Sequence, residues 1–210
     1  MINFLQFGDK LAKKKIKYFK TPIIAGKYKG KQIEIPAIST TRSSKSILRE
    51  SLFNSIALDV VGCNFVELFA GSGSIGLEAL SRSSKRAYFL EKNSTALRLL
   101  KDNVSNIAPN DSTILAGDAF ELFDGLYSRL KDSQECTFFY FDPPFSIREG
   151  MEDIYDKCID LISKIKDPFA KMVIVEHMTE VKLPDVIGDL ELFKYKKFGK
   201  SSLSYYELKG

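Results

Sequence analysis

The chain has 210 residues, of which 44% are hydrophobic and 28% are charged, a composition that excludes a disordered or fibrous protein. Its net charge of +4 is unevenly distributed, because residues 1–60 hold 12 basic and 4 acidic side chains while residues 61–210 hold 19 and 23. A basic segment on an otherwise slightly acidic chain indicates a polyanionic partner.

Residues 1–60 predict a basic amino-terminal extension made of a β-hairpin and a helix. Nine lysines fall between Lys10 and Lys31. The stretch PIIAGKYKGKQIEI (22–35) predicts two short strands around a turn near residues 28–31. The stretch TTRSSKSILRESLFNSIAL (40–58) has apolar residues at helical spacing and predicts a helix capped by Ser43 or Ser44.

Residues 61–210 predict a second unit, in which strands and helices alternate. Such alternation is typical of an α/β fold with a mostly parallel sheet covered by helices on both faces. The predicted strands are FVELF (65–69), RAYFLEKN (86–93), STILAGDAF with its loop (112–120), CTFFYF (136–141) and KMVIVEH (171–177). The predicted helices are 75–82, 94–107 and 152–165. The last segment, 191–209, predicts an antiparallel hairpin at the sheet edge with a turn near Gly199.

Cysteine and histidine content limits the chemistry. Cys63, Cys136 and Cys158 include no CxxC pair, and their odd number predicts small buried side chains rather than a disulfide framework. The one histidine, His177, cannot build a histidine–cysteine zinc site, and no GxSxG elbow accompanies it as a serine hydrolase would require. We therefore expect no metal.

The stretch ELFAGSGSIG (67–76) combines a strand end with a glycine-rich loop. Gly71, Gly73 and Gly76 have GxGxxG spacing between a strand and a helix, which lets the backbone approach a ligand at a helix amino terminus. This spacing alone fits NAD and FAD equally well. Two acids follow at the next strand ends. Glu91 is placed to accept ribose hydroxyls, and Asp118 is placed to meet an adenine amino group.

The stretch YFDPPFS (140–146) ends the most apolar strand in an acid followed by two prolines and an aromatic ring. The prolines stiffen the loop and restrict the residues before them. Asp142 and a backbone carbonyl can then accept the two hydrogens of a flat amino group, while Phe145 stacks on the ring that carries it. Such an amine is a poor nucleophile, so fixing its position against an electrophile is the catalysis it needs.

Together these motifs resemble the class I S-adenosylmethionine-dependent methyltransferases that act on exocyclic amines of bases. The order IIAGKYKGK, RSSKSILRESLFN, FVELFAGSGSIGLEALSR and FDPPF narrows the resemblance to the RsmD family, the 16S ribosomal RNA guanine-N2 methyltransferases. The similarity runs from about Ile23 to the carboxyl end. It implies a Rossmann-like sheet, S-adenosylmethionine as cofactor, and 16S rRNA within the assembled small ribosomal subunit as partner.

The resemblance also implies residue roles. Asp142, Pro143 and Phe145 would form the catalytic loop that holds the guanine. The cofactor would be held by Glu67, Phe69, Ala70, Gly71, Ser72, Gly73, Gly76, Glu91, Asp118 and Ala119. Arg42 and Arg49 match arginines of the family that lie near the cofactor and RNA entrance. The excess of basic residues, rather than the resemblance, predicts RNA phosphate contacts for Lys27, Lys29 and Lys31, and we expect these hairpin lysines to border the cofactor mouth.

One segment departs from the family pattern. Members commonly carry RPTTDRVRE where this chain has RSSKSILRE (42–50), so a proline, an aspartate and an arginine are missing although Lys45 keeps a positive charge nearby. The role of residues 43–48 is therefore open. A second lysine group (Lys194, Lys196, Lys197 and Lys200) fits a solvated hairpin face equally well.

Two rival functions remain. A DNA adenine-N6 or cytosine-N4 methyltransferase would share the DPPF loop, although the chain has no spare length for a target-recognition domain. A non-catalytic assembly factor that binds S-adenosylmethionine or RNA would need no rigid acid at position 142. No apolar run approaches the roughly 20 residues of a membrane span, and the first apolar patch precedes the lysines, the reverse of a secretory leader. We expect a cytoplasmic monomer without membrane contact.

Overall fold

The computed structural model describes residues 18–36, 42–145, 150 and 153–209, with the side chains of residues 42–44 left out. The lysine-rich stretch predicted at residues 10–17 lies outside this range. No helix of the described part is long and apolar enough to cross a membrane.

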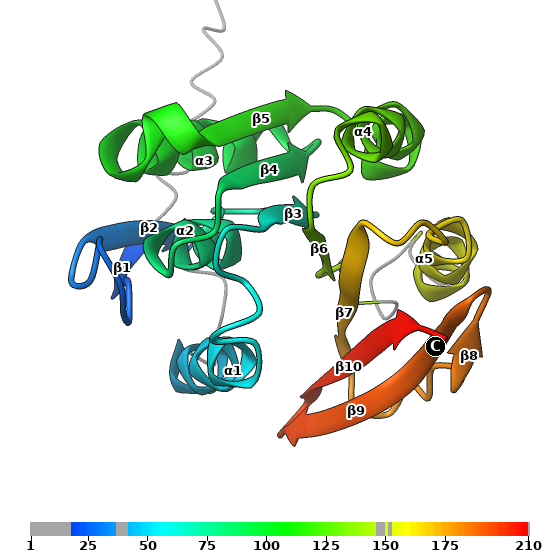
Figure 1. Ribbon diagram of the computed structural model, residues 1–210. Helices are drawn as coiled ribbons and strands as arrows, with labels where there is room; N and C mark the ends of the chain where they lie inside the picture. The colour runs from blue at the N-terminus through cyan, green and yellow to red at the C-terminus, as the bar shows by residue number, and fades with distance from the viewer. Residues whose placement is uncertain (1–17, 37–41, 146–149, 151–152, 210) are drawn as a thin grey trace, which may run out of the picture.

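An eight-stranded sheet forms the centre of the molecule (Figure 1), with strands in the order β5-β4-β3-β6-β7-β10-β9-β8. Strands β3 to β7 are parallel, and β10 pairs with β7 in the antiparallel sense. The bounds are β3 Asn64–Leu68, β4 Arg86–Glu91, β5 Ser112–Ala116, β6 Thr137–Phe141, β7 Ala170–Met178, β8 Val186–Ile187, β9 Leu190–Phe198 and β10 Ser201–Leu208. The predicted α/β fold with a carboxyl-terminal antiparallel hairpin is confirmed.

Helices cover both faces of this sheet. Helices α1 (Arg42–Ser55), α2 (Ser74–Ser81) and α3 (Ser94–Ile107) lie on one face, and α4 (Ala119–Ser133) and α5 (Ile154–Ile162) lie on the other. A short 3-10 helix, Pro109–Asp111, precedes β5. The order of the strands reverses between β3 and β6, because the chain adds β4 and β5 on one side of β3 and later adds β6 and β7 on the other. Ligands of open α/β sheets bind outside the carboxyl ends of the strands at this switch point.

The amino-terminal hairpin and α1 share their cores with the sheet. Strands β1 (Tyr18–Pro22) and β2 (Gln32–Pro36) pair antiparallel and pack through Ile23 and Ile33 against α2 and α3. Leu52 and Phe53 of α1 pack against the β3–β6–β7–β10 surface. The described part of residues 1–60 is therefore a layer of the same fold, and the predicted boundary at residue 60 stays a prediction.

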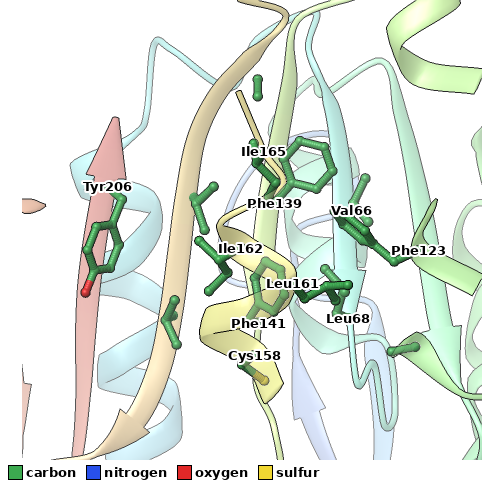
Figure 2. Packing of buried hydrophobic residues seen from close by; sticks show 14 of the residues in the cluster. Val66, Leu68, Phe123, Phe139, Phe141, Cys158, Leu161, Ile162, Ile165 and Tyr206 are labelled. Carbon is green, nitrogen blue, oxygen red and sulfur yellow. The ribbon is translucent and has the colours of Figure 1, made fainter. Parts of the chain in front are cut away.

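The largest buried cluster lies between the sheet and helices α4 and α5 (Figure 2). Phe139 and Phe141 of β6 point into it, together with Phe123 of α4 and Leu161 of α5. Strand β6 is fully buried, as the apolar run CTFFYF predicts for a central parallel strand. This packing fixes the end of β6, and with it the position of Asp142.

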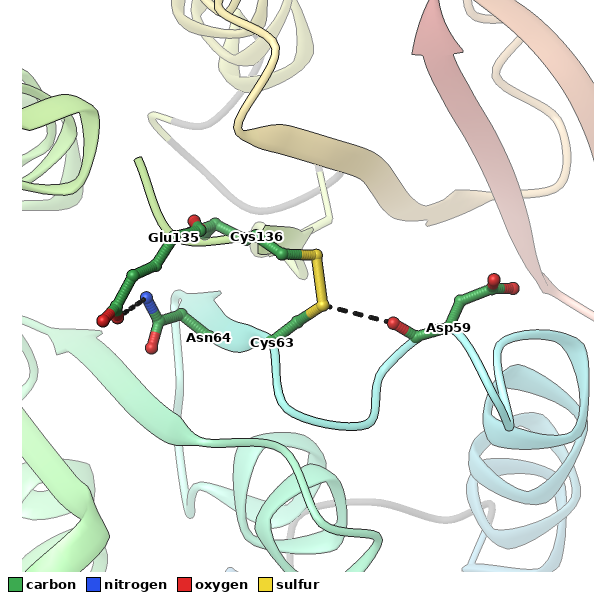
Figure 3. Close-up of a disulfide and its surroundings, with 6 residues drawn as sticks. Asp59, Cys63, Asn64, Glu135 and Cys136 are labelled. Carbon is green, nitrogen blue, oxygen red and sulfur yellow. Dashed lines mark hydrogen bonds between the residues drawn. A yellow bond between two sulfur atoms is a disulfide. The ribbon is translucent and has the colours of Figure 1, made fainter. Parts of the chain in front are cut away.

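The cysteine prediction is wrong for two of the three residues. Cys63 and Cys136 form a disulfide, with Cα atoms 4.8 Å apart (Figure 3), whereas Cys158 is buried and free. Cys63 and Cys136 come directly before β3 and β6, which are neighbours with Asn64 opposite Thr137. Their pairing depends on the strand order, which a count of cysteines and their spacing along the chain does not contain.

Candidate active site

Glu67 lies at the end of β3 and closes the amino terminus of α2. Its Oε2 accepts a hydrogen bond from the Gly76 N–H at 2.8 Å, and its Oε1 accepts from the Ile75 N–H at 3.4 Å. The side chain is buried, and burial raises the pKa of its carboxyl group to about 8 against the opposing effect of these two hydrogen bonds. The negative charges of Asp142 and Glu91 contribute in the same direction. Three of the predicted acids, Glu67, Glu91 and Asp142, therefore lie near one another.

The glycine loop turns tightly between β3 and α2. Phe69, Gly71 and Gly73 have φ values of 59°, 56° and 75°, and a left-handed conformation is strained for a phenylalanine. A Cβ atom added to Gly71 would meet no atom within 4 Å, whereas one added to Gly76 would lie 2.4 Å from the ring of Phe89. The loop backbone is thus open toward a ligand at Gly71 and tightly packed at Gly76.

The rest of the loop is held by neighbouring elements. The buried Ala70 donates its N–H to the Leu90 carbonyl of β4 at 2.9 Å. The Ser72 carbonyl accepts a hydrogen bond from the Asn103 side chain of α3 at 3.0 Å.

Glu91 is the last residue of β4, and Asp118 lies just after the end of β5, as predicted. Glu91 accepts hydrogen bonds from the Gly71 N–H at 2.7 Å and from the Asn93 N–H at 2.6 Å, which ties the β4 end to the glycine loop. Asp118 caps α4 through the Phe120 N–H at 3.0 Å and pairs with Lys92 at 2.9 Å. Partial burial is the largest single influence on the pKa of Asp118 and raises it. The hydrogen bonds from Lys92 and the Phe120 N–H, together with the charges of Lys92 and Lys157, outweigh burial, and the net shift of the pKa is downward.

A hollow of about 450 Å³ opens beside Asp118. Lys92 and Phe120 line one side, and residues of α5 line the other. Ala119, the first residue of α4, is buried and is not among the residues that line the hollow. The ring of Phe120 meets the ring of Phe69 edge-on, with 5.5 Å between their centres. The strained Phe69 therefore connects the glycine loop to this hollow.

Asp142 follows β6 at the switch point, beside β3. Its N–H donates to the Leu68 carbonyl at 3.4 Å, and the side chain is partly exposed. Pro143 is buried and Phe145 is half-buried. The predicted catalytic loop therefore starts between the ends of β3 and β7, on the edge that carries Glu67.

Two residues at this site were not predicted to belong to it. The ammonium of Lys45, on α1, lies 3.3 Å from Asp142 Oδ2 and 3.7 Å from Glu176 Oε1. Glu176, on β7, is buried and accepts a hydrogen bond from the Tyr140 hydroxyl at 2.6 Å. An acid within the apolar strand KMVIVEH was the available indication for Glu176, since buried carboxylates are rare unless they are paired.

The hairpin lysines do not border the cofactor site, and that expectation is wrong. The connection between β1 and β2 bonds to the last residue of α2, with the Lys27 N–H 2.8 Å from the Ser81 carbonyl. This is the end of the sheet opposite the arrowheads of β3, β4 and β5 in Figure 1. There Lys27 pairs with Asp111 at 3.2 Å, Lys31 lies 3.4 Å from the Asn106 carbonyl, and Lys29 is exposed.

Arg49 is an interior residue, which corrects its predicted role in RNA binding. Its side chain is buried, donates to the Pro22 carbonyl at 2.7 Å and lies 3.8 Å from the buried carboxylate of Glu78. A guanidinium enclosed in this way holds the hairpin against α1 and α2 and has no surface to offer to a phosphate. The side chain of Arg42 lies outside the described part.

The fold is that of the class I methyltransferases, since an open α/β sheet carries its acids and glycine loop at the switch-point edge. A solved structure titled "Putative methyltransferase yhhF from Escherichia coli" superposes with a TM-score of 0.70 at 25% identity, covering 91% of this chain and 99% of that one. Another solved structure, titled "Crystal structure of SMU.776, a putative methyltransferase complexed with SAH", gives a TM-score of 0.63 over 86% of this chain and 52% of its own; at 12% identity this likeness shows the fold alone.

The family follows from the sequence comparisons. The model of the family described as conserved hypothetical protein 95 matches residues 21–207, and the chain belongs to this family. A Bacillus subtilis protein named "Putative rRNA methyltransferase YlbH" is 28% identical over 90% of this chain and 99% of its own. The Escherichia coli protein named ribosomal RNA small subunit methyltransferase D is 25% identical over 88% of each chain. The predicted resemblance to the RsmD family is confirmed.

Proposed function

We propose that this protein transfers a methyl group from S-adenosylmethionine to the exocyclic N2 of a guanine in 16S rRNA. The observation that carries the proposal is the place of Asp142, on a proline-stiffened loop at the switch point and beside the glycine loop of β3. A carboxylate there can hold an amino group against a cofactor bound across the strand ends. The names of the relatives support ribosomal RNA as the acceptor.

The residues at the strand ends fit this cofactor. Glu67 and the loop from Phe69 to Gly73 would hold the methionine part, and the open backbone at Gly71 leaves room for it. Glu91 offers carboxylate oxygens to a ribose, and Asp118, which Ala119 follows in the chain, lies at the hollow where an adenine would fit. Gly76 keeps α2 close enough for Glu67 to reach its amino terminus. When bound, the cofactor supplies an electrophilic methyl group on a sulfonium.

The DPPF loop would orient the acceptor. Asp142 accepts one hydrogen of the guanine amino group, a carbonyl of the rigid Pro143 loop accepts the other, and Phe145 stacks on the base. The amine would gain positive charge as it accepts the methyl group, so the carboxylate of Asp142 would favour the transition state. The methylated amine is acidic enough to release its proton to water or to Asp142. An exposed loop base costs least to bring into such a pocket.

The RNA partner is proposed to be the assembled small subunit. Lys27, Lys29 and Lys31 lie at the far end of the sheet from Asp142, so they can contact only phosphates remote from the target base. Such contacts require a large, folded RNA and contribute salt-dependent affinity without reading sequence. Arg42 remains a proposed RNA contact. We propose that the protein acts as a monomer in the cytoplasm, where small subunits are assembled.

The test is transfer of labelled methyl from S-adenosylmethionine to three acceptors: small subunits lacking the modification, naked 16S rRNA, and duplex DNA. Asp142→Ala should lose at least about a hundredfold in rate. Glu191→Ala, which removes an exposed glutamate of β9 paired with Lys209 and away from the hollow, is the control and should keep full activity. Transfer to a guanine N2 of the ribosomal acceptors supports the proposal.

Two other outcomes would favour a different function. Transfer to DNA would indicate an amino-methyltransferase of DNA. Cofactor binding without transfer to any acceptor, together with full cellular function of Asp142→Ala, would indicate a non-catalytic assembly factor.

A further inference from the structure

The side-chain ammonium of Lys45 lies at the carboxylate of Asp142, the group proposed to hold the amino group of the target guanine. Its ammonium comes from α1 and reaches across to Asp142 Oδ2 at 3.3 Å, with the lysine side chain 54% exposed. Lys45 lies in the first turn of α1, and its side chain spans the distance from this helix to the end of β6.

A second carboxylate stands beside the first with unused hydrogen-bonding capacity. Glu176 is 2% exposed, and its Oε2 accepts from the Tyr140 hydroxyl at 2.6 Å. Its Oε1 has no hydrogen-bond partner among the described residues, although the Lys45 ammonium lies 3.7 Å away. A buried carboxylate oxygen without a hydrogen bond is costly. A shift of the ammonium by about 1 Å would bring it to hydrogen-bonding distance.

We propose that Lys45 is a positioning residue that holds Asp142 until the acceptor amine binds and then passes its hydrogen bond to Glu176. This inference rests on the proposed function, since the guanine amino group would replace the Lys45 ammonium as the hydrogen-bond donor to Asp142. No covalent bond changes in the step. The ammonium leaves Oδ2, the guanine amino group donates to the same oxygen, and Glu176 Oε1 gains the partner that it lacks.

The charges around Asp142 give Lys45 a second effect on the same group. Among the described side chains, the titratable groups that interact with Asp142 or with its partner Lys45 include Lys45 of α1, Glu67 of β3, Tyr140 of β6, Tyr155 of α5 and Glu176 of β7. Lys45 is the cation in this set. Asp142 and then Glu176 raise the pKa of Lys45, and by reciprocity the charge of Lys45 favours the ionised form of Asp142.

The test compares Lys45→Met with Lys45→Arg, which keeps the charge. Lys131→Met is the matched control, because Lys131 pairs with an aspartate at 2.9 Å but at the opposite edge of the sheet. We expect Lys45→Met to lower kcat about ten- to hundredfold at pH 7, with little change in KM for the RNA, and to move the acid limb of the pH–rate profile up by about one unit. Lys45→Arg should restore the acid limb, and Lys131→Met should match the wild type.

A second measurement does not depend on activity. The carboxyl carbon of Asp142 is titrated by NMR in labelled wild type and Lys45→Met, after thermal unfolding has shown that both are folded. We expect a higher pKa of Asp142 in the variant. Equal titration curves, or an unchanged kcat and pH profile in an active enzyme, would overturn the role of Lys45. A wild type without transfer to any acceptor would overturn the proposed function and the exchange step, while the titration would still decide the charge coupling.

Discussion

The carboxylate of Glu67 and the backbone N–H of Gly76 are joined by a hydrogen bond of 2.8 Å inside the protein. The bond attaches the end of β3 to the start of α2 and leaves an acid enclosed beside Asp142 and Glu91. Burial is the largest cause of its raised pKa of about 8. The carboxyl group is therefore protonated in the folded protein at a pH where an unfolded chain has already lost that proton.

The first prediction concerns stability against pH. Between about pH 4.5, the ordinary value for a glutamate, and pH 8, the folded state binds one more proton at Glu67 than the unfolded state. The contribution of Glu67 to stability is therefore complete below pH 4.5 and is lost as pH rises through 8. Glu67→Gln should flatten the decline in the free energy of unfolding between pH 5 and 8.5. Urea titrations of both proteins across this range measure it, and parallel declines would contradict the shift.

The strand-end acids could be predicted because they depend on local pattern alone. Glu67, Glu91 and Asp142 each follow a run of strand residues, and parallel strands bring their carboxyl ends to one edge of the sheet. Even the glycine loop needed only its position between a strand and a helix. No knowledge of the strand order was required for any of these residues.

The features that the sequence did not reveal all depend on contacts between distant segments. Lys45 meets Asp142 across 97 residues, and it does so because α1 packs against β6 and β7. Cys63 meets Cys136 because β6 is inserted beside β3. In the sequence Arg49 resembles a surface cation of a basic segment, whereas in the structure the hairpin covers its side chain. The direction of the hairpin, which places its lysines far from the site, is set by bonds to the end of α2.

The second prediction concerns the buried carboxylate of Glu78. It accepts the Ile24 N–H at 2.8 Å and the Ala25 N–H at 3.1 Å, and it pairs with Arg82 at 2.9 Å and Arg49 at 3.8 Å. Glu78→Gln leaves the buried guanidinium of Arg49 without its counter-charge, and we expect a loss of about 3 kcal/mol in unfolding free energy.

Urea unfolding measures the loss. Asp153→Asn, which breaks an exposed pair with Lys157, is the control and should leave the free energy of unfolding close to that of the wild type, because exposed pairs contribute little. Equal effects of the two variants would show that the Glu78 network does not hold the hairpin.

The third prediction concerns the Cys63–Cys136 disulfide, whose cysteines are 73 positions apart in the sequence. In the chain-entropy account a crosslink over such a loop stabilises the fold by about 4 kcal/mol. Reductant should therefore lower the unfolding midpoint of the wild type in urea. The Cys63→Ser/Cys136→Ser protein should start at the lower value and show no response. Cys158→Ser should still respond as the wild type does, because the Cys158 thiol is buried and unpaired. A wild type insensitive to reductant would contradict the prediction.

The fourth prediction compares two groups of lysines. Ser201 lies opposite Met178, whereas Phe141 lies opposite Val175, so the turn between β9 and β10 extends beyond the strand ends at the edge that carries Asp142. Lys197 and Lys200 flank this turn and are exposed, and neither has an ion-pair partner among the described residues. We expect them to contact the phosphates nearest to the target base.

Two double variants test this placement. Lys197→Gln/Lys200→Gln should weaken binding both to a short RNA hairpin carrying the target guanine and to the small subunit, and should lower the slope of log affinity against log salt by about 2. Lys27→Gln/Lys29→Gln should weaken binding to the small subunit alone, since those lysines lie at the far end of the sheet and a short RNA cannot reach them. Binding measured at several salt concentrations distinguishes the two groups. If the short RNA responded to Lys27 and Lys29 but not to Lys197 and Lys200, the target would approach from the hairpin side and the proposed path of the RNA would be wrong.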